Sequence, residues 1–178
     1  MSIDIMVDLE TTGVSAGCGI LAIGACSFLG KYTFYDRIHP HSCLTAGLKE
    51  DPETLKWWNK QDRAARDEAF SGTKDLVMVL GQFADFLRCL PAPSKVVYLW
   101  GNGADFDLPI LSAAYSAVGM KTPWEPFNGR CYRTLKNLYK PIAMREFEGL
   151  KHTALADAKN QAAHAREILR IHFDKQQD

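Results

Sequence analysis

Three short acidic motifs, far apart in this sequence of 178 residues, contain the side chains best suited to chemistry. The first is Asp8 and Glu10, two positions apart in an apolar run, so that both point to the same side of a β-strand. The second is Asp107, which follows a glycine-containing loop. The third pairs His152 with Asp157 at the start of a long amphipathic segment. If the fold brings them together, four carboxylates and an imidazole can bind cations and transfer a proton.

Each motif alone also has a purely structural interpretation. The Asp8–Glu10 pair could be a solvated strand end, Asp107 could stabilise a helix N-terminus, and a histidine such as His152 is usually just exposed. Five helical steps would place His152 and Asp157 on different faces of a helix. Their spacing therefore suits a shared site only if Thr153 is the N-cap and His152 precedes the helix.

The hydrophobic pattern predicts the elements that must position these motifs. Runs with alternating or continuous apolar residues predict strands at residues 3–10, 19–29, 32–38 and 95–100, the first three as an antiparallel meander. Apolar residues at three- and four-residue steps, or capping signals, predict helices at residues 52–59, 63–71, 74–90, 108–118, 132–139 and 153–173. This order favours an α/β fold with a mixed sheet, and the length suits a single domain over residues 1–178.

Composition excludes several classes of protein. Hydrophobic residues make up 47% and charged residues 24%, which excludes a disordered tail, a collagen-like repeat and a coiled-coil rod. The 21 basic and 21 acidic side chains cancel, so any positive surface must be local. Five scattered cysteines without a CxxC pair, and a start without a secretory signal, predict a cytoplasmic protein with reduced thiols. No apolar run approaches the roughly 18 residues that cross a bilayer, so we expect no membrane partner.

The three motifs, in this order, resemble those of the DnaQ-like 3′–5′ exonucleases of the DEDDh subtype. The matching segments are residues 8–13 (DLETTG), residues 102–107 (NGADFD) and residues 152–157 (a histidine and an aspartate with four residues between them). Asp105 is also acidic, but the family pattern of an aspartate directly after an aromatic residue selects Asp107.

The resemblance extends from residue 6 to about residue 165. Within the family, residues 51–58 and residues 100–103 are similar to the phage and prophage exonucleases, to which the RNase AS-type exoribonucleases are related. The RNase AS type is dimeric, so the analogy allows a homodimer.

The resemblance implies an RNase H-like fold, with a mixed five-stranded sheet flanked by helices. It implies a hydrolase that uses two divalent cations, Mg²⁺ or Mn²⁺, and a histidine as general base. The metal ligands would be Asp8, Glu10, Asp107 and Asp157, and the catalytic residues would be these four and His152. The chemistry agrees, because oxygen ligands suit Mg²⁺ or Mn²⁺ and cations would offset the repulsion among the carboxylates.

The implied substrate is single-stranded DNA or RNA with a free 3′ end, DNA being favoured, and the product is a nucleoside 5′-monophosphate. Candidate substrate-binding residues adjoin the motifs or belong to an aromatic pair: Thr11, Thr12, Gly13, Asn102, Phe106 and Trp58. The Trp57–Trp58 pair could stack on bases or belong to the core. Residues 130–151 contain six basic and two acidic side chains, which could follow a phosphate backbone or form a solvated face.

Other functions stay open. Within the same class, the chain could be an exoribonuclease that trims RNA, or a phosphodiesterase of small nucleotides. From another class, it could be a non-catalytic nucleic-acid-binding or polymerase-associated subunit. Two further patterns carry less weight: residues 17–22 match a loose dinucleotide-binding motif but are followed by a strand, and residues 39–43 (HPHSC) lack a fourth metal ligand.

Overall fold

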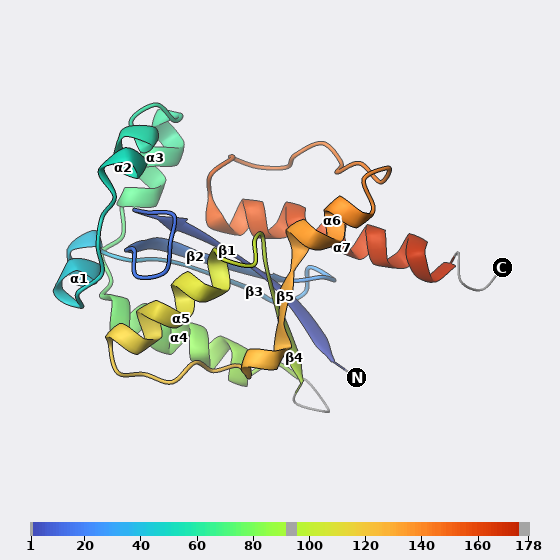
Figure 1. Cartoon of the computed structure of the whole chain (residues 1–178), viewed down its shortest axis with the longest axis horizontal. Helices are drawn as coiled ribbons and strands as arrows, with labels where there is room; N and C mark the ends of the chain where they lie inside the picture. The colour runs from blue at the N-terminus through green and yellow to red at the C-terminus, as the bar shows by residue number, and fades with distance from the viewer. Residues whose placement is uncertain (1, 92–95, 175–178) are drawn as a thin grey trace.

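The sheet starts with the antiparallel meander that the alternation predicts: β1 (Ile3–Thr11), β2 (Ile20–Ser27) and β3 (Thr33–Arg37). β4 (Val97–Gly101) pairs parallel with β1, and β5 (Gly129–Cys131) pairs parallel with β4. The strand order is β3-β2-β1-β4-β5, which places β1 at the centre (Figure 1). The computed structural model describes residues 2–91 and 96–174; Lys95, where the sequence predicts that the fourth strand begins, lies outside the described residues.

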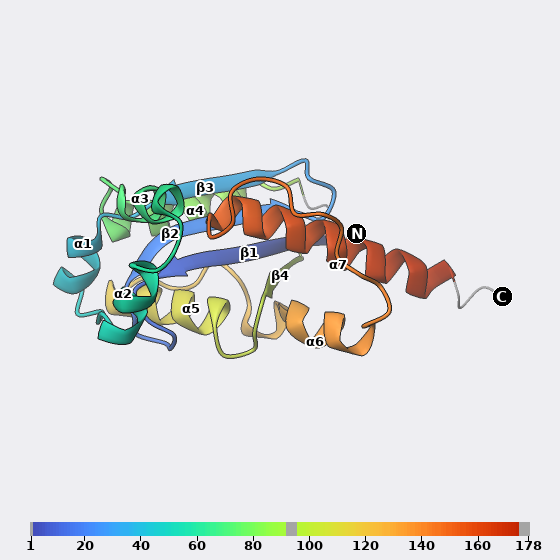
Figure 2. The same cartoon turned by 90° about the horizontal axis from the view of Figure 1, so that it is seen from above.

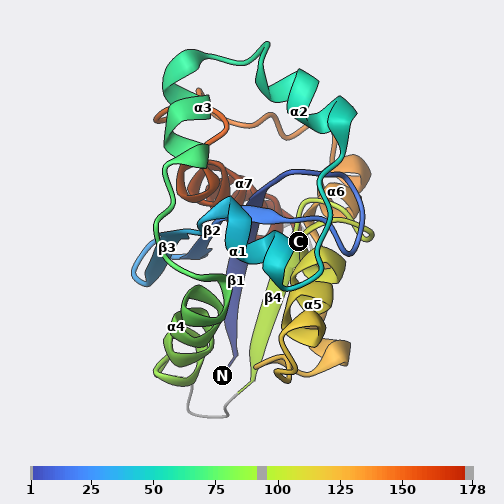
Figure 3. The ribbon, with the colours of Figure 1, turned by 90° about the vertical axis from the view of Figure 1, so that its left-hand side faces the viewer.

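Helices lie on both faces of the sheet. They are α1 (Pro40–Thr45), α2 (Pro52–Trp58), α3 (Arg63–Phe70), α4 (Leu76–Arg88), α5 (Asp107–Ala117), α6 (Tyr132–Leu138) and α7 (Ala154–Asp174), with a short 3₁₀ helix at Pro126–Asn128. Apolar residues of α4 and α5 pack on one face, and those of α6 and α7 pack on the other. The long α7 runs along the sheet (Figure 2), and α2 and α3 lie near the end of the sheet where α7 begins (Figure 3). No helix in the described part of the chain is long and apolar enough to cross a membrane.

The central strand β1 is buried on both faces, and its alternation decides which side chains reach the site. Ile5, Val7 and Leu9 belong to the core shared with α4 and α5. Met6 points the other way, into the cluster that contains alanines of α7. Because successive side chains alternate, Asp8 and Glu10 lie on the α7 face of the sheet, as Met6 does.

Gly24 of β2 allows the start of α7 to lie directly on the sheet. A Cβ atom at this position would lie 2.2 Å from the carbonyl carbon of Ala154 and 2.3 Å from the nitrogen of Leu155. Gly24 is also the cross-strand partner of Asp8 in β1. The glycine therefore allows the first turn of α7 to approach the row of the sheet that contains Asp8.

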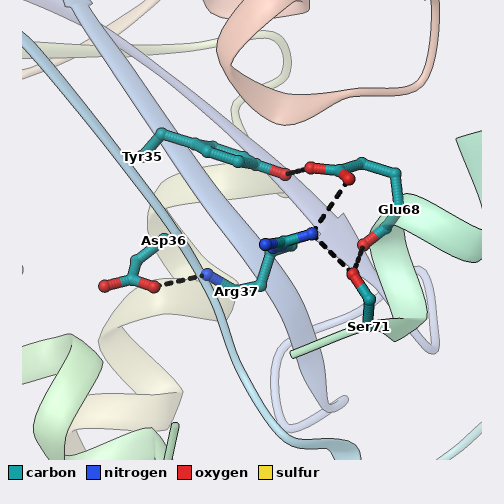
Figure 4. A network of polar contacts seen from close by, with 5 residues as sticks. All are labelled: Tyr35, Asp36, Arg37, Glu68 and Ser71. Carbon is teal, nitrogen blue, oxygen red and sulfur yellow. Dashed lines mark hydrogen bonds and ion pairs between the residues drawn. The ribbon is translucent and has the colours of Figure 1, made fainter. Parts of the chain in front are cut away.

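A polar network fixes α3 against β3 (Figure 4). The Tyr35 hydroxyl donates to Glu68 Oε1 at 2.6 Å, and Arg37 donates to Glu68 Oε2 at 2.9 Å and to Ser71 Oγ at 2.6 Å. The ring of Trp58 in α2 packs against Phe70 of α3, so α2 contacts the helix that this network fixes.

Three short elements are absent from the prediction: α1, the 3₁₀ helix at Pro126–Asn128 and β5. Residues 40–45 form α1 with Pro40 in its first turn, a position to which proline is well suited. The sequence does not predict β5, because three residues are too few to show an alternating pattern. Thr153 precedes α7 as predicted, but its hydroxyl has no hydrogen-bond partner among the described residues, so the side-chain cap does not form.

Candidate active site

The first and third acidic motifs meet on the α7 face of the sheet. Asp8 and Glu10 project from β1, and Asp157 projects from the first turns of α7. One carboxylate oxygen from each of these three residues lies within 4.8 Å of the other two. Oxygens at this spacing can bind a common divalent cation.

The second motif joins them through Asp107, the first residue of α5, which is 1% exposed. Its Oδ1 accepts a hydrogen bond from the Leu9 nitrogen at 3.3 Å, and its Oδ2 accepts one from the Asn102 nitrogen at 2.6 Å. The bond to Leu9 places this carboxylate between Asp8 and Glu10 along β1. Asp105, the other acid of this motif, is exposed.

His152 has left-handed backbone geometry, with φ at 59°, and is the one non-glycine residue with positive φ in the described chain. It lies just before α7, as the spacing argument requires. Its ring is perpendicular to the ring of Trp57 from α2, with 5.1 Å between the centroids. A non-glycine residue in this region of backbone space is uncommon and often marks a functional site.

A cleft of about 700 Å³ joins the three motifs to α2. Asp8, Glu10, His152 and Asp157 line it, and the buried Asp107 accepts a hydrogen bond from the nitrogen of Asn102, which also lines it. The predicted substrate-binding residues that line the cleft are Thr11, Gly13, Asn102, Phe106 and Trp58. Thr12 does not line it, because its side chain is 2% exposed and its hydroxyl contacts the carbonyls of Gly19 and Lys49.

Burial and mutual repulsion make these carboxyl groups hard to ionise. Burial raises the pKa of Glu10 to about 8, with further contributions from Asp157 and Asp107. Burial raises the pKa of Asp107 to about 6, although backbone hydrogen bonds and Arg133 oppose the shift. The pKa of Asp8 is raised well above its usual range by burial and then by the neighbouring acids.

These observations fit a divalent-cation site. A cation would stabilise the ionised carboxylates against burial, which raises all three pKa values, and against the repulsion that adds to the shifts of Asp8 and Glu10. Asp157 Oδ2 and Asn102 Oδ1 are buried and have no hydrogen-bond partner among the described residues, so both oxygens can still accept a ligand. The oxygen-only donor set suits Mg²⁺, Mn²⁺ or Ca²⁺ better than zinc.

Comparison with known proteins agrees with this geometry. Residues 3–169 match the family model described as the 3′–5′ exoribonuclease Rv2179c-like domain. The chain belongs to this exoribonuclease family. The predicted membership of the DnaQ-like 3′–5′ exonucleases is thus confirmed, and the protein is a hydrolase of this class. Among curated proteins, none matches the sequence significantly.

Solved structures share the fold at low sequence identity. The nuclease domain of 3′hExo, described as a DEDDh family member bound to rAMP, is 16% identical, with a TM-score of 0.63 over 95% of this chain and 92% of that one. A full-length 3′-exonuclease is 16% identical, with a TM-score of 0.64 over 96% and 82%. The cell-death related nuclease CRN-4 is 14% identical, with a TM-score of 0.53 over 95% and 64%. The predicted RNase H-like fold is confirmed.

In this exoribonuclease-family protein, the two neighbouring tryptophans differ in environment. Trp58 is 2% exposed, its indole nitrogen donates to the Thr11 carbonyl at 2.9 Å, and its ring packs against Phe70. Trp57 is 42% exposed and contacts the ring of His152. Of the pair, Trp57 therefore offers the free aromatic surface to a ligand in the cleft.

Sequence reasoning did not single out Gln161. This residue is 5% exposed, and its Nε2 donates to Asp8 Oδ1 at 2.7 Å, while its Oε1 is buried without a partner in the described chain. It follows Asp157 by four residues, which places both on the same face of α7. The four-residue spacing from Asp157 is the one sequence feature that points to Gln161 as a site residue. It is a weak feature, because glutamine on a helix face is usually solvated.

The pKa of Glu10 leads to a test of the site that needs no substrate. In a chelator, the free energy of unfolding should fall by about 3 to 4 kcal/mol between pH 5 and pH 8 through Glu10 alone. The folded protein holds the Glu10 proton up to about pH 8, whereas the ordinary pKa is 4.5, so the stabilisation present at low pH is lost as pH rises through this window. Glu10→Gln should remove a large part of this fall in denaturant titrations.

Glu146→Gln is the matched control, because Glu146 is exposed. This variant should keep the pH dependence of the wild-type protein. A wild-type protein that becomes more stable between pH 5 and pH 8 would contradict the expected clustering of buried acids.

Proposed function

We propose that this protein hydrolyses the 3′-terminal phosphodiester of single-stranded RNA and releases nucleoside 5′-monophosphates. The observation that carries the proposal is the convergence of Asp8, Glu10 and Asp157 within 4.8 Å, beside the buried Asp107. RNA replaces the DNA that the sequence favoured, because the matching family is described as exoribonucleases. We further propose that residues 1–178 act as a single catalytic domain, and that a homodimer is the working assembly.

Each functional side chain has a proposed role. Asp8, Glu10, Asp107 and Asp157 would hold two divalent cations, Mg²⁺ or Mn²⁺. When bound, these cations would neutralise the acids and stabilise the negative charge that develops on the attacking and leaving oxygens. Gln161 orients the Asp8 carboxylate through its hydrogen bond.

His152 acts as the general base. A ring nitrogen takes a proton from the attacking water while the water oxygen forms a bond to the terminal phosphorus. The bond between that phosphorus and the 3′ oxygen of the preceding nucleotide breaks, and this oxygen gains a proton. Trp57 supports the ring of His152 from the side and limits its movement.

A non-catalytic module is the weaker alternative. Holding buried carboxyl groups against one another raises their pKa values and destabilises the metal-free fold. A protein that only bound nucleic acid would gain nothing from this cost, because anionic side chains repel phosphates.

A time course with 5′-labelled single-stranded RNA and DNA of equal sequence tests the proposal, with Mg²⁺, with Mn²⁺ and with a chelator. We expect a ladder that shortens from the 3′ end, a faster rate on RNA, and no cleavage in the chelator. An oligomer with a blocked 3′ end is the control and should persist. Internal cuts, or no ladder with either metal, would refute the exonuclease assignment. The proposed homodimer is tested separately, by light scattering.

A further inference from the structure

A second groove continues the catalytic cleft along α6. It has a volume of about 520 Å³ and lies between the loop after β4 and the start of α6. Val14, Phe106 and Arg133 line both the groove and the cleft. Because the cleft and the groove share these lining residues, a nucleic-acid strand with its end in the cleft can continue into the groove.

Arg133 lies at the junction and is available to a ligand. Its side chain is exposed and makes no hydrogen bond or ion pair with any residue in the described part of the chain. A Cβ atom on Gly103 would lie 3.6 Å from Arg133 Cζ, so the guanidinium lies against the loop of the second motif. Its positive charge also lowers the pKa of Asp107, against the effect of burial, which is consistent with a position near the acids.

The other basic side chains of residues 130–151 do not line the cleft or the groove. Arg130 stacks on the Tyr98 ring at 4.2 Å and donates to two carbonyls. Arg145 pairs with Glu167 at 3.1 Å. Of the six basic side chains in residues 130–151, Arg133 is therefore the one that lines the cleft and the groove.

The rest of the groove suits a nucleotide. Thr134 and Asn137, on the exposed side of α6, offer a hydroxyl and an amide, and Phe106 offers an apolar surface. Asp105 is the acidic lining residue, but it is exposed, and no ion pair within 4.0 Å joins it to Arg133 among the described residues. The guanidinium thus keeps its charge and its planar set of donors for a phosphate.

We propose that Arg133 binds the phosphodiester directly upstream of the scissile one, and that the groove along α6 holds the nucleotide between these two phosphates. This inference rests on the proposed function, because it requires a 3′-terminal nucleotide in the catalytic cleft. It predicts that a third nucleotide, with its additional phosphate, strengthens binding.

The test compares a dinucleotide, which contains the scissile phosphate alone, with a trinucleotide, which adds the upstream phosphate. Arg133→Ala should raise KM for the trinucleotide about tenfold and leave KM for the dinucleotide and both kcat values within about twofold, as expected when one charge-assisted contact is lost. Arg133→Lys should recover part of the affinity, because it keeps the charge but loses the planar donors. Arg63→Ala is the control, because Arg63 is 88% exposed on α3 and does not line the cleft or the groove.

A binding measurement separates failure of this inference from failure of the proposed function. With Ca²⁺ in place of Mg²⁺, the salt dependence of trinucleotide binding should weaken in Arg133→Ala by about 0.7 in the slope of log K against log salt, the value expected for one single-strand phosphate. Equal KM changes for both substrates, or an unchanged trinucleotide KM and salt slope, would overturn the role of Arg133. Absence of cleavage by the wild-type protein would instead refute the exonuclease function, and the salt slope would still test the groove.

Discussion

Replacing Asp8 with alanine is expected to lower kcat by about 10³-fold or more without unfolding the protein. Asp8 lies at the centre of the acidic cluster, where Glu10, Asp107 and Asp157 all raise its pKa and Gln161 fixes one of its oxygens. Its loss would remove a ligand of the proposed cations. In a chelator at pH 8, the variant should be at least as stable as the wild-type protein, because it removes a buried carboxyl group whose ionisation is opposed by burial and by the neighbouring acids.

Asp105→Ala is the matched control for this experiment. Asp105 is exposed, and it lies two positions from Asp107 in the same motif. This variant should keep kcat within a few fold of the wild-type value. Asp107→Ala, in contrast, should lower kcat as strongly as Asp8→Ala does. A fully active Asp8→Ala protein, shown by thermal unfolding to be folded, would defeat the proposed mechanism.

Replacing His152 with alanine is expected to lower kcat by about 10²- to 10⁴-fold, the range for removal of a general base. Metal affinity should change far less, because the cluster of carboxylate oxygens within 4.8 Å does not include the imidazole. Calorimetric titration with Mn²⁺, alongside a rate assay, separates the two effects.

His41→Ala is the control, because His41 is exposed at the start of α1 and lines a different cavity. It should leave both rate and affinity unchanged. The opposite pattern for His152→Ala, with weakened metal binding and an unchanged kcat at saturating metal, would make His152 a ligand and leave the base unidentified.

Local patterns predicted most of the fold because local forces set those elements. Alternation along β1 predicted both its strand form and the common direction of Asp8 and Glu10. Asp51 caps α2 through the Glu53 nitrogen at 3.0 Å, with Pro52 in the first turn, as those residue types predict. The short β5 was not predictable, because its form depends on pairing with β4.

The assembly of the site depends on contacts between distant parts of the chain. Gly24 allows the start of α7 to lie against the sheet, and this approach brings Asp157 to the carboxylates of β1. Packing of α2 and α3 decides that Trp58 is buried and Trp57 faces the cleft. Neighbouring tryptophans have the same intrinsic preferences, so the local sequence cannot separate them.

The sequence by itself determined the chemical groups of this protein, their order along the chain and the strands and helices that bear them. Residue type and short-range periodicity are sufficient for these features. The tertiary structure alone decided that Gln161 reaches Asp8 and that Arg133 lies where the cleft meets the groove. Both depend on how α6 and α7 dock on the sheet, and that docking arises from side-chain packing across the whole core rather than from any local pattern.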